Sequence, residues 1–282
     1  MSQKPPSAYV VGVVLVVVSA VTFSTAGLFT KGVEAGSWEV IFWRALFGAV
    51  FTTLWIMNRG TLRQDFAGMG YSGVAIGVIG ALGTAAFITS FKFTTIANVS
   101  LIYAISPLIA ALLAWVFIRE KVSATTMAGC LGALAGVAII VSGSLGQVSL
   151  TGDLLALWMA IVMATIMVLY RKYPDTPGAG PAVLASVLLL PFAVFFGEPF
   201  NVDQTEIWIL AAFGMLFAIA SVTLAEGAKR VPSGQTALLS ILETPLAPIF
   251  AFFLLAEVPN TPTLIGGAVV LVAVLVSLRT KP

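Results

Sequence analysis

The sequence contains no histidine, a single cysteine and few charged residues. Only 9% of the 282 residues are charged, against about 25% in an ordinary soluble domain. Without histidine the chain lacks the commonest metal ligand and general base, and Cys130 by itself forms no intramolecular disulfide. We therefore expect neither a metal site nor a cofactor.

The sequence also lacks the motifs of nucleotide-driven pumps and of membrane enzymes. No Gly-x-x-x-x-Gly-Lys-Ser/Thr phosphate loop occurs, which disfavours a pump driven by nucleotide hydrolysis. The acidic residues lie mostly in loops and at the ends of apolar runs, with no nucleophile beside a base, which disfavours a membrane enzyme. Almost no residues remain outside the apolar runs for a soluble or nucleic-acid-binding module, so we expect no nucleic-acid partner.

Apolar runs of membrane-spanning length fill nearly the whole chain. Hydrophobic residues make up 59% of the sequence, and each run is close to the ~20 residues that cross a bilayer core. The first run is too long for the apolar region of a signal peptide, although Val18-Ser19-Ala20 loosely resembles a cleavage site. We predict ten spans, at residues 9–30, 38–57, 71–91, 96–118, 125–142, 152–170, 180–196, 208–225, 235–255 and 262–278.

The positive residues predict the orientation of these spans. If the N-terminus is cytoplasmic, only Lys31 and Lys92 lie in external segments, and Arg44 lies within a span. The other Lys and Arg residues then lie inside: Lys4, Arg59, Arg63, Arg119, Lys121, Arg171, Lys172, Lys229, Arg230, Arg279 and Lys281. This asymmetry predicts a multi-pass inner (plasma) membrane protein with both termini in the cytoplasm.

The two halves of the sequence resemble each other. ISPLIAALLAWVFIREKVSATTMAG (105–129) aligns with ETPLAPIFAFFLLAEVPNTPTLIGG (243–267). The alignment pairs Pro107 with Pro245, Glu120 with Glu257 and Gly129 with Gly266. It places five spans in residues 1–146 and five in residues 147–282, and because five is odd, the second unit enters the membrane with the opposite topology. Inverted repeats of this kind are typical of secondary transporters, whose substrate sites lie between the halves near mid-membrane.

The repeated pattern resembles the EamA family of the drug/metabolite transporter superfamily. It consists of a mid-helix proline, a helix ending in LLAWVFIREKVS with its glutamate, and a glycine in the next helix. The resemblance covers essentially the whole chain and implies an all-α basket of ten transmembrane helices in two inverted five-helix repeats. It also implies outward movement of small metabolites by alternating access. Size and general sequence character resemble the bacterial exporters of aromatic amino acids within this family.

Glu243 is the foremost candidate site residue, because a carboxylate deep in a membrane usually faces a cavity or a partner. Thr236, Ser240 and Glu243 recur on one face of the predicted span 235–255, and we expect this stripe to face a central cavity. Alternatively, Glu243 is structural and caps backbone groups that Pro245 and Pro248 leave free. The aligned first half has Ile105 at this point, so a bent helix alone does not require the acid.

Three prolines and one arginine are candidates for gating. Pro107, Pro245 and Pro248 each remove a backbone hydrogen bond, which makes a hinge or a static kink. Arg44 lies two turns into its predicted span, and we favour snorkelling to the outer interface or pairing with nearby acids, Glu34 or Glu39. The alternative for Arg44 is to hold a substrate carboxylate or to close an outer gate.

Further polar and small residues have two interpretations. Gly73, Gly77, Gly80 and Thr84 form one stripe, as do Gly132 and Gly136, and both stripes are typical of close helix packing or of a cavity wall. Tyr103 and Trp158 could stack against an aromatic cargo. The remaining deep polar candidates are Ser24, Asn98 and Ser100.

Together these features predict a secondary transporter that exports amino acids, aromatic or large apolar ones first. The alternative is an exporter of other metabolites or of lipophilic cations, for which one buried glutamate would suffice. A membrane enzyme and a purely structural bundle are disfavoured. The expected partners are the small-molecule substrate, the lipid bilayer and, if Glu243 carries them, protons.

Overall fold

The computed structural model describes residues 6–142, 149–246, 249–250 and 261–278, and every regular element within them is a helix. The helices are α1 (Pro6–Phe23), α2 (Ala26–Lys31), α3 (Ser37–Asn58), α4 (Leu62–Phe66), α5 (Gly70–Phe93), α6 (Ile96–Tyr103), α7 (Ser106–Ile118), α8 (Ala124–Ser142), α9 (Leu150–Lys172), α10 (Ala179–Phe196), α11 (Gln204–Ala228), α12 (Ser233–Ser240) and α14 (Thr261–Leu278).

Nine spans within the described residues are long and apolar enough to cross a bilayer, which makes this a multi-pass membrane protein. Most predicted boundaries are confirmed to within a few residues; the largest difference is at α11, which is longer at both ends than the predicted 208–225. The predicted span 235–255 is represented by α12 and helical residues 243–246, and the rest of it, with Pro248, lies outside the described residues. The tenth crossing therefore stays a prediction.

Two further predicted spans are interrupted. The first is divided into α1 and α2 at Ser24 and Thr25, and the fourth into α6 and α7 at Ala104 and Ile105. At the second break the backbone N–H of Ile105 donates to the carbonyl of Ile102, three residues earlier, at 3.2 Å. This 3₁₀-type bond closes a tighter turn than the α-helical bond to the fourth residue back. Pro107 follows at the start of α7, where a missing N–H costs least. The proline thus begins a new helix rather than bending a continuous one.

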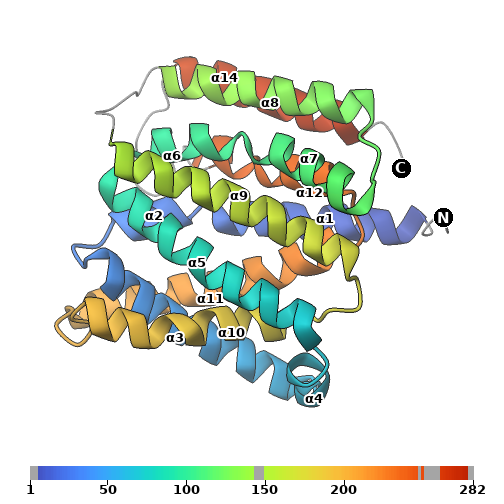
Figure 1. The fold of residues 1–282 in the computed structure, drawn as a ribbon. Coiled ribbons are helices and arrows are strands. Elements are labelled where there is room, and N and C mark those ends of the chain that lie inside the picture. The colour runs from blue at the N-terminus through green and yellow to red at the C-terminus, as the bar shows by residue number, and fades with distance from the viewer. Residues whose placement is uncertain (1–5, 143–148, 247–248, 251–260, 279–282) are drawn as a thin grey trace.

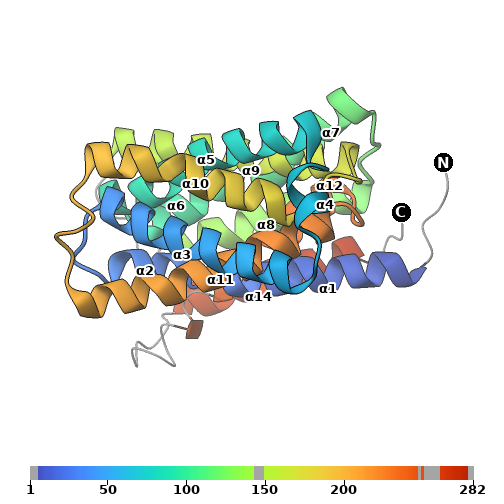
Figure 2. The same cartoon turned by 90° about the horizontal axis from the view of Figure 1, so that it is seen from below.

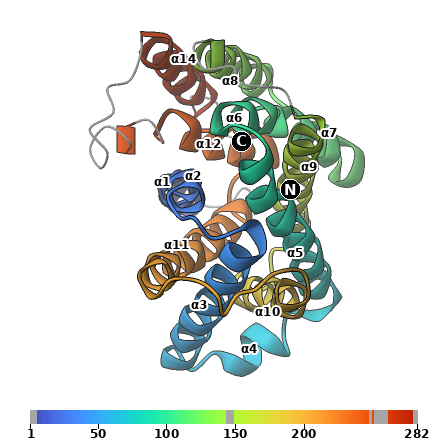
Figure 3. The same cartoon turned by 90° about the vertical axis from the view of Figure 1, so that its left-hand side faces the viewer.

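The helices run side by side, and α1 begins and α14 ends at the same end of the bundle, which we call the N/C end (Figures 1 and 2). Seen along the helix axes, α8 and α14 lie together on one side and α3, α4 and α10 on the other, with α1, α5, α9 and α11 between them (Figure 3). Buried apolar residues form one large cluster around α1, α8, α9, α12 and α14, and a second around α3, α5, α10 and α11.

Helix contacts recur between the first and second halves of the chain. Helix α5 packs on α9 and α11 packs on α1, while α10 packs on both α3 and α5 and α3 also packs on α11. The last spans of the two halves, α8 and α14, meet along their length. There an added Cβ on Gly136 would lie 2.8 Å from the carbonyl oxygen of Gly266, so the backbones touch. For Gly132 and Gly136 the packing interpretation holds.

Candidate functional site

A cavity lies inside the bundle, between the two clusters of apolar residues. Its volume, counted as the space that the centres of water molecules can occupy, is about 100 Å³. Its walls come from both halves of the chain and are mainly apolar, with four phenylalanines among them: Phe23, Phe87, Phe213 and Phe217. The polar side chains that line it belong to Arg44, Thr84, Tyr103, Tyr170, Ser221 and Glu243. An apolar chamber with a few convergent polar groups is the usual form of a small-molecule site.

Three interrupted helices meet at this cavity. Phe23 and Ala26 line it from either side of the α1–α2 break, and Tyr103 lines it from the end of α6. Glu243 lines it just after the turn that follows α12. Discontinuous helices at mid-membrane are typical of transporter substrate sites, because their freed backbone groups are tolerated only where they line a cavity or meet protein.

Glu243 is half-buried at the cavity wall, and its carboxylate has no hydrogen bond or ion pair with any described residue. Pro245 has no backbone N–H, so the carbonyl of Ile241 lacks the donor that it would have in a continuous helix. This carbonyl instead accepts the backbone N–H of Thr244 at 2.9 Å. Its hydrogen bond therefore comes from the backbone and does not involve Glu243. Its carboxylate faces a space where a ligand or a proton could reach it.

Arg44 is buried on the cavity wall, so its side chain does not reach out of the bundle as snorkelling would require. The residue is 2% exposed, and its guanidinium carbon lies 3.9 Å from the ring centroid of Phe217 and 5.7 Å from that of Phe213. Nε and Nη2 have no acceptor within the described part of the chain. Neither expected acidic partner contacts it.

Close packing between α3 and α11 holds Arg44 in this position. A Cβ on Gly214 would lie 2.8 Å from the backbone oxygen of Arg44 and 2.8 Å from the backbone nitrogen of Gly48. Because only glycine permits this approach, the Arg44 side chain is pressed against the aromatic rings of α11. A cation over an aromatic face gains attraction when it is removed from water.

Several predicted site residues lie away from the cavity. The Thr236 and Ser240 hydroxyls are buried and donate to the carbonyls of Val231 and Thr236, so the expected stripe reaches the cavity only at Glu243. Ser24 donates to the carbonyl of Val21, and the Asn98 amide to Thr94 Oγ1, at 3.1 Å. Ser100 is half-buried and is not part of the lining.

Trp158 is 46% exposed on the outer face of α9, and this position removes it from the candidate site. The predicted residues that do line the cavity are Arg44, Thr84, Tyr103 and Glu243. Pro107 and Pro245 are buried next to the helix breaks. Gly80 also lines the cavity, whereas a Cβ on Gly77 would lie 2.8 Å from the Leu184 side chain. The glycine stripe of α5 therefore contributes both to the cavity wall and to close helix packing.

Sequence reasoning missed the lining residues of α11. Phe213, Phe217 and Ser221 recur at four-residue intervals and share one helix face towards the cavity. The spacing is visible in the sequence, but α11 is apolar on all sides, so periodicity alone gives no preferred face. Tyr170, near the end of α9, was also missed.

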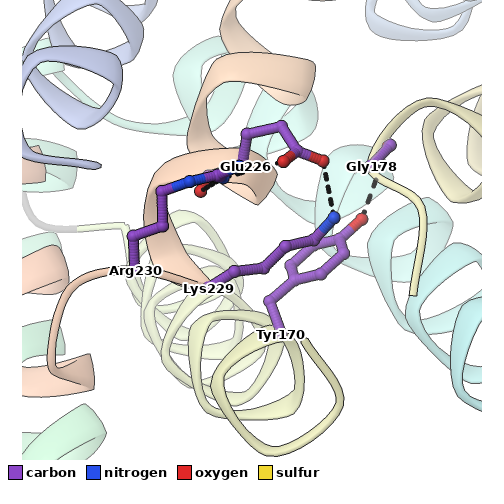
Figure 4. A network of polar contacts seen from close by, with 5 residues as sticks. All are labelled: Tyr170, Gly178, Glu226, Lys229 and Arg230. Carbon is purple, nitrogen blue, oxygen red and sulfur yellow. Dashed lines mark hydrogen bonds and ion pairs between the residues drawn. The ribbon is translucent and has the colours of Figure 1, made fainter. Parts of the chain in front are cut away.

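Ion pairs and a hydrogen bond gather at the N/C end, close to the cavity. Tyr170 and Ala225 line the cavity, and beside them Glu226 pairs with Lys229 at 2.5 Å and with Arg230 at 2.8 Å (Figure 4). The Tyr170 hydroxyl donates to the carbonyl of Gly178 at 3.5 Å, which links α9 to the segment before α10.

A second contact at the same end links α7, α9 and α12. The Glu120 carboxylate pairs with Arg171 at 3.1 Å and accepts the backbone N–H of Ser233 at 3.0 Å.

Carboxylates at the opposite end bind backbone N–H groups instead of cations. Glu206 accepts from the N–H groups of Glu34 and Ala35, and Glu39 accepts from that of Glu198 at 2.7 Å. These bonds join the segment between α2 and α3, and the first turn of α3, to the α10–α11 region. Asp203 caps α11 nearby, and hydrogen bonds from Thr205 lower the pKa of the Asp203 carboxyl.

A bundle of helices long and apolar enough to span a membrane, with a cavity at broken helices, is typical of membrane transporters, and sequence comparison identifies the family. The profile of the EamA-like transporter family matches residues 10–142 and again residues 150–279. The chain therefore belongs to the EamA-like transporter family, and the two matches divide it close to the boundary predicted from its internal repeat.

The chain is also similar to individual proteins. The chain is 24% identical over 267 residues to "Uncharacterized transporter YyaM" of Bacillus subtilis, covering 89% of this chain and 85% of that protein. It is 28% identical over 288 residues to "Solute carrier family 35 member G1" of Mus musculus, covering 93% of this chain and 76% of that protein. A crystal structure of another protein shares the fold, with a TM-score of 0.82 at 19% identity over 98% of this chain and 99% of the other.

Proposed function

We propose that this transporter exports amino acids, with aromatic or large apolar side chains preferred, from the cytoplasm by alternating access. The observation that carries the proposal is the cavity itself: phenylalanine-rich walls surround a carboxylate, Glu243, that no described residue neutralises. Apolar walls suit a large apolar side chain, and an unpaired carboxylate suits an ammonium group.

Alternating access requires two halves that move relative to each other around the site. We take these to be residues 1–146 and 147–282, oppositely oriented, with both termini in the cytoplasm. The recurrence of helix contacts between the halves and the double family match support this division. The lining includes Tyr170, near the end of α9, and Pro181, near the start of α10, and a cavity reached from the N/C end would be loaded from the cytoplasm.

The second candidate is an exporter of lipophilic cations, and the same carboxylate favours it. One acid in an apolar chamber is enough to attract a delocalised cation. Arg44 in the same wall argues against this candidate, because like charge repels.

Counterflow in proteoliposomes distinguishes the two candidates. Vesicles loaded with unlabelled phenylalanine should accumulate labelled phenylalanine, and vesicles loaded with tetraphenylphosphonium should not accumulate its labelled form. The reverse result would replace amino acids with lipophilic cations. Recovery of chemically unmodified solute separates a carrier from an enzyme, and vesicles without protein are the control.

A further inference from the structure

Arg44 and Glu243 bring opposite charges into one chamber. Of the described residues that line the cavity, Arg44 is the one cation and Glu243 the one anion. They come from α3 in the first half of the chain and from the segment after α12 in the second. No ion pair joins them in this structure.

Arg44 has two hydrogen-bond donors without acceptors at a buried position. A charged group removed from water needs partners, and stacking on Phe217 satisfies the face of the guanidinium but not the N–H groups at its edge. Nε and Nη2 form one edge of the planar group, with parallel N–H bonds. Neighbouring atoms cover both nitrogen atoms in this structure, so a ligand reaches them only when those atoms move aside. Once reached, the edge matches the two oxygens of a carboxylate, and one ligand group can satisfy both donors.

We propose that the Nε–Nη2 edge of Arg44 binds the carboxylate of the transported solute while Glu243 binds its ammonium group. The inference rests on the proposed function and deepens it: the site selects solutes that carry both charges. Phe213 and Phe217 flank Arg44, and Phe23 and Phe87 complete the apolar wall that receives the side chain. Because a zwitterion has no net charge, its binding adds no net charge to the cavity.

Three ligands that share one ring test each charge separately. Phenylalanine carries both groups, phenethylamine lacks the carboxylate and 3-phenylpropionate lacks the ammonium. Their affinities are measured by competition with labelled phenylalanine in counterflow and, independently of transport, by the rise in melting temperature of the protein in detergent. The wild type should bind phenylalanine most tightly.

Substitution of Arg44 should act only on ligands with a carboxylate. Arg44→Gln should weaken phenylalanine and 3-phenylpropionate by roughly tenfold to a hundredfold, the usual range for a lost hydrogen bond to a charged group, and leave phenethylamine unchanged. Glu243→Gln should do the reverse, weakening phenylalanine and phenethylamine but not 3-phenylpropionate. Arg44→Lys, which keeps the charge but not the planar edge, should lie between the wild type and Arg44→Gln.

Arg59→Gln is the matched control, because the Arg59 guanidinium also lies over an aromatic ring, 4.7 Å from the Trp55 centroid, but outside the cavity. It should leave all three affinities unchanged. If Arg44→Gln folds poorly, Arg44→Lys and Arg44→Met provide the same comparison with a side chain of similar length.

The outcomes separate this inference from the proposed function. Equal weakening of all three ligands by Arg44→Gln, or no weakening of any, overturns the role of Arg44 while phenylalanine transport by the wild type still stands. If the wild type transports no amino acid but binds 3-phenylpropionate through Arg44, the proposed function fails and the carboxylate site remains. A wild type that binds no carboxylate overturns both.

Discussion

The two halves of the chain meet in two regions that are built in opposite ways. At the α8–α14 contact both halves contribute glycines. Gly136 packs on Gly266, and Gly129, which aligns with Gly266, is also close to α14: its added Cβ would lie 3.0 Å from the carbonyl oxygen of Ala273. In the cavity they contribute unlike groups, a cation from Arg44 and an anion from Glu243.

This difference separates what the two aligned halves share from what they do not. Backbone contact depends only on small residues at the crossing point, so similar sequences can supply both sides. A site for a solute with different groups at its two ends needs different groups from each half. The aligned positions Ile105 and Glu243 illustrate this, because a proline follows two residues after each but only one carries a charge.

The largest expected effect is at the matched contact. Gly136→Val should prevent stable folding or lower the free energy of unfolding by about 1–3 kcal/mol or more, because its Cβ would lie 2.8 Å from the Gly266 oxygen and 2.9 Å from the Val270 nitrogen. Melting temperature and monodispersity in detergent are the measurements. Gly267→Ala is the control, with its nearest neighbour, Pro245 Cβ, at 3.4 Å. Equal stability of the two variants would show that the α8–α14 contact is looser than described.

The next effect concerns the unmatched carboxylate. If Glu243 carries a proton across the membrane, Glu243→Gln should reduce pH-gradient-driven accumulation of substrate by about tenfold or more while exchange of a substrate that it still binds persists, because the amide cannot release a proton. Accumulation and counterflow are measured in the same vesicles. Retention of both activities would exclude Glu243 as the proton carrier. Ile105→Gln, at the aligned position, is the control and should leave accumulation in place.

The two prolines test whether the halves move alike. Pro107→Ala and Pro245→Ala should each slow transport several-fold with little change in substrate affinity, because a restored backbone N–H stiffens the break beside the cavity. Initial rates and binding are measured for each variant. An effect of only one substitution would mean that the movement is confined to one half, and unchanged rates for both would leave the prolines only the static role of shaping the cavity.

The smallest expected effect distinguishes the ends of the bundle. Glu226→Gln removes two partly exposed ion pairs and should cost less than about 1 kcal/mol of stability. It should nevertheless speed labelling by an impermeant maleimide at Ser221→Cys, in a Cys130→Ala background, by loosening the N/C end next to the cavity.

Glu206→Gln, at the opposite end, is the comparison for this experiment. Its carboxylate accepts two backbone N–H groups far from the N/C end, so its substitution should not change labelling from that side. Equal labelling of all variants would mean that the Glu226 contacts do not limit access to the cavity.

Much of the fold could be predicted because hydropathy and length dominate in a membrane. The predicted span 38–57 became α3 at Ser37–Asn58, and 262–278 became α14 at Thr261–Leu278. The breaks within the spans 9–30 and 96–118 were not predicted. Hydropathy does not sense them, since the residues on both sides remain apolar.

The site was predicted only in part, and the reason differs from residue to residue. Glu243 stood out because a carboxylate within an apolar run is costly. Trp158 has the right chemistry but lies on the exposed side of α9. Arg44 was assigned to the interface from its depth along the helix, whereas its position depends on the contact of α3 with Gly214 of the distant α11.

The sequence by itself determined that this is a membrane protein, where most helices begin and end, and which family it belongs to. These properties follow from apolar length and from a repeated local pattern. Only the tertiary structure decided which side of each apolar helix faces the cavity and that Arg44 and Glu243 share it. In a chain that is apolar on every face, helix orientation is set by packing between segments far apart in the sequence, and no local pattern encodes that packing.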